Sequence, residues 1–255
     1  EYFANELRAA AQFLETHTGH KLDLDKLKSI IDESNKHYEL WQEYNDLRRV
    51  TPVPYGWAKA DICGAIAQGA GVGRPEATRW FQELVDLAER KVEAGEGVVS
   101  GKEEIRMLWW DLNSVFGHKF LPWLEEEYGA VVVMDWAGNH SYTAIDTSSE
   151  EEMWRGMAKR CLYDTPMIRQ ANGTADNMVN DLVRVVEDFD IDVVVWPGHM
   201  GHKDLLATYG IIREKCRELG VHFLDIRMDI WDERYMTADQ IKDKFVRFFE
   251  AAGYA

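Results

Sequence analysis

The chain has 255 residues, of which 46% are apolar and 29% charged, and its formal net charge is -16. This balance is typical of a globular protein with a buried core and argues against a disordered chain. The negative charge argues against binding to a nucleic-acid backbone, which needs clustered Lys and Arg. No apolar run reaches the roughly 20 residues that cross a bilayer.

The number of cysteines and the first residues of the chain indicate the cellular compartment of the protein. The three cysteines, Cys63, Cys161 and Cys216, are widely spaced and form no CxxC pair, which suits a reducing compartment. The chain shows no signal peptide, so we expect a cytoplasmic protein. Glu1 already begins an amphipathic helical pattern, and we therefore expect a further segment before it.

The first hundred residues are predicted to form a helical segment, 1–100, which can complete a preceding domain. Apolar side chains recur every three or four residues from Leu27 to Tyr44 and share one face of a long helix. Asp23 or Asp25 can cap the start of this helix, and the prolines that follow residue 50 end it.

Two more helices are predicted, over about 57–68 and from Pro75 to about Ala94, with a glycine-rich stretch at 69–73 between them. That stretch resembles a phosphate-binding loop in composition. However, it follows a helix and lacks the GK[ST] ending that places a lysine on phosphate. A plain connection between two helices is the favoured interpretation.

From residue 105 onward, short apolar runs alternate with helical stretches. The predicted strands are 105–109, 130–134, 192–196 and 221–226, and the last helix runs from about Thr237 to Ala252. Strands that are apolar on both faces and separated by helices indicate a parallel sheet covered on both sides. We therefore predict an α/β protein, in which 101–255 form a doubly wound, mostly parallel four-stranded sheet of Rossmann/flavodoxin-like type.

In open parallel sheets, ligands bind beyond the carboxyl ends of the strands. Of the four loops that this rule selects, 198–204 carries the most chemistry. Gly198 and Gly201 permit tight turns, and His199, His202 and Lys203 gather at the start of a predicted helix. Such a loop can ligate a metal, hold an anion or move protons. Histidines that only hydrogen-bond to the backbone are the alternative.

The other three loops carry tryptophans and carboxylates. The predicted strand ends are followed by Trp110, by Trp136 with Asn139 and His140, and by Trp231. Large aromatic side chains at this edge can wall a ligand pocket, or they can fill the core beneath the loops. Three aspartates of these loops, Asp135, Asp229 and Asp232, can serve as acids or bases or cap the next helix.

The order of these stretches resembles the subunits of the 2-hydroxyacyl-CoA dehydratase and benzoyl-CoA reductase family, as the C-terminal portion of such a subunit. The match covers essentially the whole chain. It is carried by 14–19, Asn35, 52–54, 190–195, the His–Gly loop, 219–225, Asp229, Asp232, Arg234, Gln240 and Lys244.

The resemblance implies an oxygen-sensitive enzyme that acts on a CoA thioester. Two homologous subunits pair, each able to hold a [4Fe–4S] cluster, and a separate ATP-hydrolysing iron–sulfur protein supplies single low-potential electrons. In dehydratases a ketyl radical allows loss of the β-proton and the 2-hydroxyl group; in reductases an aromatic ring is reduced. A preceding domain of the family subunit supplies two cluster cysteines.

One departure from the family pattern bears on the reaction. His202 stands where the family has its third cluster cysteine. Histidine can replace a cluster thiolate and raises the potential. His202 is thus a cluster ligand, or a proton donor beside a cluster held elsewhere, or the mark of a subunit without a cluster.

The substitution favours the benzoyl-CoA reductase branch, in which ring protonation needs an acid. We expect catalysis by His199, His202 and Lys203, and substrate binding by Trp110, Trp136, Asn139, His140 and Trp231. The alternatives are a 2-hydroxyacyl-CoA dehydratase subunit, a non-catalytic scaffold for a cluster-bearing homologue, and an unrelated α/β protein with a histidine-lined anion site.

Overall fold

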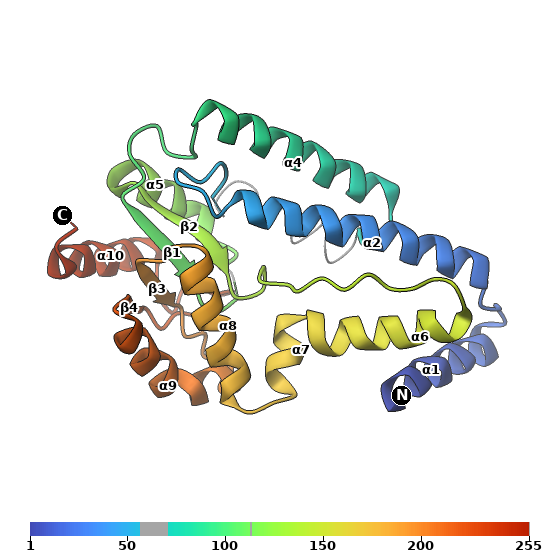
Figure 1. Ribbon diagram of the computed structural model, residues 1–255. Coiled ribbons are helices and arrows are strands. Elements are labelled where there is room, and N and C mark those ends of the chain that lie inside the picture. The colour runs from blue at the N-terminus through green and yellow to red at the C-terminus, as the bar shows by residue number, and fades with distance from the viewer. Residues whose placement is uncertain (57–70, 113, 255) are drawn as a thin grey trace. The chain divides into compact units, whose positions relative to one another are not determined.

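A computed structural model describes residues 1–56, 71–112 and 114–254 (Figure 1). The helix predicted over 57–68, together with Cys63, lies outside the described residues. Contacts within the described chain group it into two units that interleave along the sequence. The predicted boundary near residue 100 stays a prediction. The helical unit comprises Glu1–Asn45, the described part of Cys63–Asp86, and His140–Asn172; the sheet unit comprises the described parts of Asp46–Ile62, Leu87–Asn139 and Gly173–Ala255.

The helices of the first unit follow the predicted pattern closely. Asp23 caps the long helix, because its Oδ1 accepts the backbone N–H of Lys26 at 2.9 Å. Trp154 and Ala158 pack against Ala4 of the first helix. The elements are α1 (Tyr2–Thr18), α6 (Glu150–Lys159), the π-helix η2 (Arg160–Asp164), α7 (Pro166–Ala171), and most of α2 (Leu24–Leu47) and α4 (Pro75–Ala94), whose last residues are assigned to the sheet unit.

The sheet unit holds one sheet, in which the described residues form four parallel strands. These are β1 (Ile105–Trp109), β2 (Ala130–Asp135), β3 (Val193–Trp196) and β4 (His222–Asp225). Their order is β2-β1-β3-β4, and every neighbouring pair is parallel. The predicted α/β class with a four-stranded sheet is confirmed, and each strand ends within one residue of its prediction.

Helices cover both faces of this sheet (Figure 1). One face packs on α5 (Leu121–Tyr128) and α10 (Ala238–Ala252), and the other packs on α8 (Ala175–Asp188) and α9 (Lys203–Leu219). Alternate strand residues face the two cores, as the pleat of a strand requires. The first core includes Met107, Val132, Val195, Phe120, Leu124, Phe245 and Phe249, and the second includes Leu108, Val133, Val194, Leu182, Val185 and Ile212. No helix among the described residues is long and apolar enough to span a bilayer.

The strand order creates a switch point between β1 and β3. From β1 the chain crosses to β2 on one side and then returns to β3 on the other. The loops that leave the carboxyl ends of β1 and β3 therefore diverge, and such a divergence is where open α/β sheets bind ligands. The backbone N–H of Trp110 donates to the carbonyl oxygen of Val195 at 2.8 Å, which holds the two loops together at their origin.

Candidate functional site

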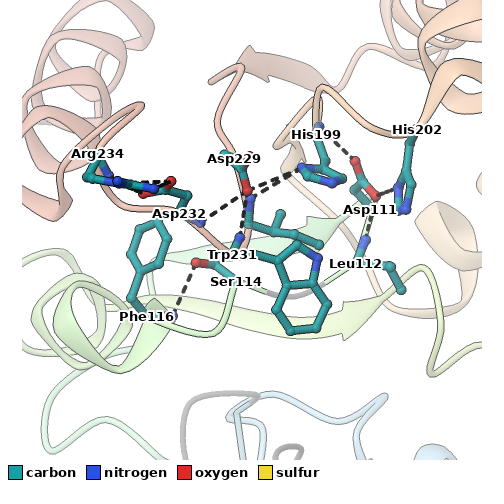
Figure 2. Close-up of polar contacts among 11 residues, drawn as sticks. Asp111, Leu112, Ser114, Phe116, His199, His202, Asp229, Trp231, Asp232 and Arg234 are labelled. Carbon is teal, nitrogen blue, oxygen red and sulfur yellow. Dashed lines mark hydrogen bonds and ion pairs between the residues drawn. The ribbon is translucent and has the colours of Figure 1, made fainter.

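The buried carboxyl group of Asp111 lies at this switch point, two residues after the end of β1. Only 1% of its side chain is exposed. Its Oδ1 lies 2.7 Å from Nδ1 of His202 and accepts the backbone N–H of Leu112 at 2.6 Å. Its Oδ2 accepts the backbone N–H of His199 at 3.1 Å. Three N–H groups thus converge on one carboxyl group (Figure 2), which compensates for its removal from water.

The contact with Asp111 determines which nitrogen of His202 carries a proton. Because Oδ1 of Asp111 already accepts from Leu112, it acts as an acceptor toward His202 as well, and Nδ1 of His202 is the donor. In the neutral ring, Nε2 then holds the free lone pair. His202 immediately precedes α9 and is partly exposed, so this lone pair is available to a ligand.

His199 has the opposite arrangement. Its Nδ1 accepts the backbone N–H of Ile230 at 3.3 Å, so the proton of the neutral ring is on Nε2. Oδ1 of Asp229 lies 3.8 Å from the same Nδ1, close enough to pair with a protonated ring. The ring also packs against Gly201, where an added Cβ would lie 2.8 Å from Nε2. The glycine therefore provides the space that the His199 ring occupies.

The two imidazole rings are neighbours, with centroids 5.0 Å apart and planes at 88°. His202 offers a proton acceptor and His199 a proton donor. Paired groups of this kind can take one proton from a substrate and deliver another. Asp111, His199 and His202 together are called the His–Asp site below.

The turn after β4 borders the His–Asp site. Oδ1 of Asp229 accepts the backbone N–H groups of Trp231 and Asp232 at 2.8 and 3.1 Å, so this carboxyl group stabilises the turn, while Thr237 caps the next helix. Asp232 forms an ion pair with Arg234, and this pair lowers the pKa of Asp232 to about 2. Trp231 itself is exposed to solvent.

Of the predicted catalytic residues, His199 and His202 lie side by side, and Lys203 is exposed at the first residue of α9. The prediction did not single out Asp111 as a site residue. The signal that could have found it is its position two residues after a strand that is buried on both faces.

The predicted substrate-binding residues lie in different surroundings. Trp136 is buried with its ring 6.5 Å from that of His202. Trp110 is fully buried in the core that the sheet forms with α8 and α9. Asn139 is buried, and its Oδ1 accepts from Arg184 at 2.5 Å. Direct contact of these side chains with a ligand stays a prediction.

His140 belongs to the helical unit and is treated within it. Its ring lies 6.0 Å from that of Tyr38, and Nδ1 is enclosed without a hydrogen-bond partner among the described residues. Burial lowers the pKa of His140 to about 4. The ring is therefore neutral near pH 7.

The described residues do not fit a complete iron–sulfur site. No group of three or more His, Cys, Asp or Glu side chains among them is arranged to hold a metal ion. Cys216 lies on the buried face of α9. Burial raises the pKa of its thiol to about 12, so the thiol stays protonated. Cys161 belongs to the helical unit. Of the His–Asp site, only Nε2 of His202 has the chemistry to approach a metal.

The fold and the His–Asp site define an α/β protein with two neighbouring imidazole rings and a buried carboxyl group at the switch point of a parallel sheet. The chain belongs to the 2-hydroxyglutaryl-CoA dehydratase D-component family, whose model matches residues 1–251. No curated protein matches the chain. The resemblance drawn from the sequence is confirmed. The chain is thus a 2-hydroxyacyl-CoA dehydratase-type subunit, and as a D-component it works in a complex with a partner.

Proposed function

We propose that the His–Asp site of this subunit moves protons on a CoA thioester during dehydration of its 2-hydroxyacyl group. The observation that carries the proposal is the 2.7 Å contact between Oδ1 of Asp111 and Nδ1 of His202. A buried carboxylate that holds one nitrogen of an imidazole ring fixes the tautomer and aims the other nitrogen at the substrate. The position at the switch point supports the same conclusion.

The overall reaction requires two proton movements. Removal of a proton from C3 and of the hydroxyl group from C2 gives a 2,3-unsaturated thioester, and the hydroxyl group leaves as water after it gains a proton. Nε2 of His202 is suited to accept the carbon-bound proton, and the Nε2–H of His199 is suited to supply one to the hydroxyl group. Lys203, exposed beside them, would attract an anionic part of the ligand.

The electron chemistry belongs to the complex as a whole. As the resemblance implies, the complex contains a [4Fe–4S] cluster, a homologous second subunit and an ATP-hydrolysing iron–sulfur donor, and it works in the cytoplasm without oxygen. Since the described residues of this chain do not form a cluster site, we assign no cluster ligand among them, and the lone pair on Nε2 of His202 serves as the proton acceptor. The roles of the other described residues do not depend on the cluster.

Reduction of an aromatic ring, as in benzoyl-CoA reductases, is a second candidate. The exposed indole of Trp231 beside Asp229 favours it, because an aromatic acyl group can stack on such a surface. Trp110 gives this candidate no support, because it is fully buried in the core.

The test uses the complex purified without oxygen, with its partner and electron donor. Wild type, His202→Gln and the control Glu214→Gln are assayed with 2-hydroxyglutaryl-CoA and with benzoyl-CoA. Glu214 pairs with Arg217 on the solvent side of α9. We expect His202→Gln to lower turnover by about 100-fold or more and Glu214→Gln to leave it unchanged. The thioester that is consumed identifies the reaction. Full activity of His202→Gln would assign the subunit a scaffold role instead.

A further inference from the structure

Trp231 is exposed to solvent and lies in a turn whose backbone is held by several hydrogen bonds. Trp231 is 67% exposed, although Met228 and Ile230, which both precede it in the chain, are fully buried. Its backbone N–H donates to Asp229. The carbonyl oxygen of Ile230 accepts from Val115 at 3.0 Å, and the N–H of Met228 donates to Pro197 at 2.8 Å. These hydrogen bonds therefore fix the backbone position of Trp231.

Exposed apolar side chains also project from the two neighbouring loops. Val115 follows β1 and is 49% exposed, and Met200 lies between the two histidines and is 50% exposed. Three loops at the carboxyl edge of the sheet thus each present a large apolar side chain around the His–Asp site. Ligand pockets combine a mostly apolar lining with a few polar groups at fixed positions, and this edge has both parts.

We propose that Trp231 is a stacking platform for the flat ring system of the CoA thioester bound at the His–Asp site. The inference rests on the proposed function, since it assumes that the thioester binds at this edge. An indole fixed by its backbone and free on its face can stack on a planar π system with little loss of conformational freedom. The ring is either the adenine of CoA or an aromatic acyl group.

The surroundings of Trp231 favour a ligand over a protein partner. Its neighbour in the turn, Asp232, pairs with the exposed Arg234, so the indole lies next to a charged pair. A polar rim with one aromatic surface suits a nucleotide, which brings a flat ring and charged phosphates together. Burial of Trp231 against the partner subunit is the competing outcome.

The experiment measures binding by titration calorimetry to the assembled complex, without the electron donor, so that no ligand is consumed. The ligands are 2-hydroxyglutaryl-CoA, the same acyl group on pantetheine, and benzoyl-pantetheine. The variants are Trp231→Ala, Trp231→Phe and Tyr235→Ala. Tyr235 is a matched control because it is an exposed aromatic residue in the same loop.

If Trp231 stacks on adenine, Trp231→Ala weakens binding of the CoA ester by about 10-fold or more and leaves both pantetheine esters unchanged. If Trp231 stacks on an aromatic acyl group, Trp231→Ala weakens the binding of benzoyl-pantetheine and leaves the binding of the aliphatic pantetheine ester unchanged. In either case Trp231→Phe retains most of the affinity and Tyr235→Ala retains all of it.

Two results would overturn the platform while the proposed function stands. In the first, Trp231→Ala binds all three ligands as wild type does. In the second, Trp231→Ala dissociates the complex in size-exclusion chromatography, which would assign the indole to the subunit interface. Failure of the wild-type complex to bind any of the three ligands would overturn the proposed function together with the platform.

Discussion

Oδ1 of Asp111 and Nδ1 of His202 lie 2.7 Å apart, although 91 residues separate them in the chain. They meet because β1 and β3 are neighbours in the sheet and both strands end at the same edge. The same carboxyl group also receives the backbone N–H of His199. The loop after β3 is therefore held at two points by one residue of the loop after β1.

Asp111→Asn is expected to separate the effect on chemistry from the effect on binding. An amide presents both a donor and an acceptor toward His202, so it no longer imposes one tautomer on the ring. We expect kcat to fall by about 100- to 10,000-fold, with KM changed by only a few fold. Steady-state kinetics of the complex measures both parameters.

Asp111→Glu is the companion variant. It retains the charge and the acceptor oxygens but lengthens the side chain, so partial recovery of kcat is expected if His202 is oriented by a carboxylate. A KM increase that accounts for the whole loss of kcat/KM in Asp111→Asn would contradict this positioning role and indicate that Asp111 acts in binding.

Gly201→Ala tests the space that the His199 ring occupies. The new Cβ would lie 2.8 Å from Nε2 of His199, so the ring has to shift, which disturbs its contacts with Ile230 and Asp229. We expect a loss of turnover of at least 10-fold and a fall of a few degrees in Tm.

Gly210→Ala is the matched control for this substitution. Gly210 lies within α9, and a Cβ there meets nothing within 4 Å. Alanine at an open helical position stabilises by up to about 1 kcal/mol, so Tm is expected to rise with activity retained. Equal activity of the two variants would show that the His199 ring does not depend on Gly201.

The strands and helices of the sheet unit could be predicted from the sequence because their patterns are local. Residues 105–109 are apolar enough to be buried on both faces, and β1 has those bounds. Thr237 and Gln240 form a capping box at the start of α10, close to the predicted helix start. Signals of this kind depend on neighbouring residues alone.

The order of the strands could not be predicted in this way, because it depends on contacts between distant segments. Without that order, nothing in the sequence pairs Asp111 with His202. The orientation of the tryptophan side chains could not be predicted from the sequence either. Trp110 and Trp231 both follow strands, yet Trp110 is fully buried in the core and Trp231 is exposed. A position after a strand does not determine which way a side chain points.

Arg106 is expected to be the most sensitive charged residue of the sheet unit. It forms a buried ion pair with Glu103, and its remaining N–H groups donate to the carbonyl oxygens of Arg48, Val50 and Phe189. Arg106→Met leaves these acceptors buried without donors, which costs about 3–5 kcal/mol of unfolding free energy. Urea unfolding measures the loss.

The control for Arg106 is an exposed arginine of the same unit. Arg217 pairs with Glu214 on the surface of α9, and Arg217→Met is expected to cost less than about 1 kcal/mol. Because Glu103 is the charge left unpaired by Arg106→Met, adding Glu103→Leu should recover part of the stability. A loss below 1 kcal/mol in Arg106→Met would show that water replaces the missing donors.

Acid is expected to destabilise the helical unit through His37. This side chain is fully buried, and neither ring nitrogen has a hydrogen-bond partner among the described residues. Burial lowers the pKa of His37 to about 4, while Glu33 opposes the shift and Arg160 adds to it. Between about pH 6.5 and 4, unfolded chains therefore bind a proton at this position that folded chains do not.

It follows that unfolding free energy falls as the pH falls through this window, by at most about 3 kcal/mol for His37. His140, whose pKa is also lowered to about 4, contributes a second fall of similar size.

His37→Phe removes the titrating group and keeps a ring that can pack on Phe81, 4.5 Å away in the wild type. Urea unfolding at pH 7.5 and 4.5 should show a smaller pH dependence in this variant than in wild type, and the wild-type pH dependence in the control His20→Gln, which changes an exposed residue. An unchanged pH dependence in His37→Phe would mean that His37 takes up its proton equally in folded and unfolded chains.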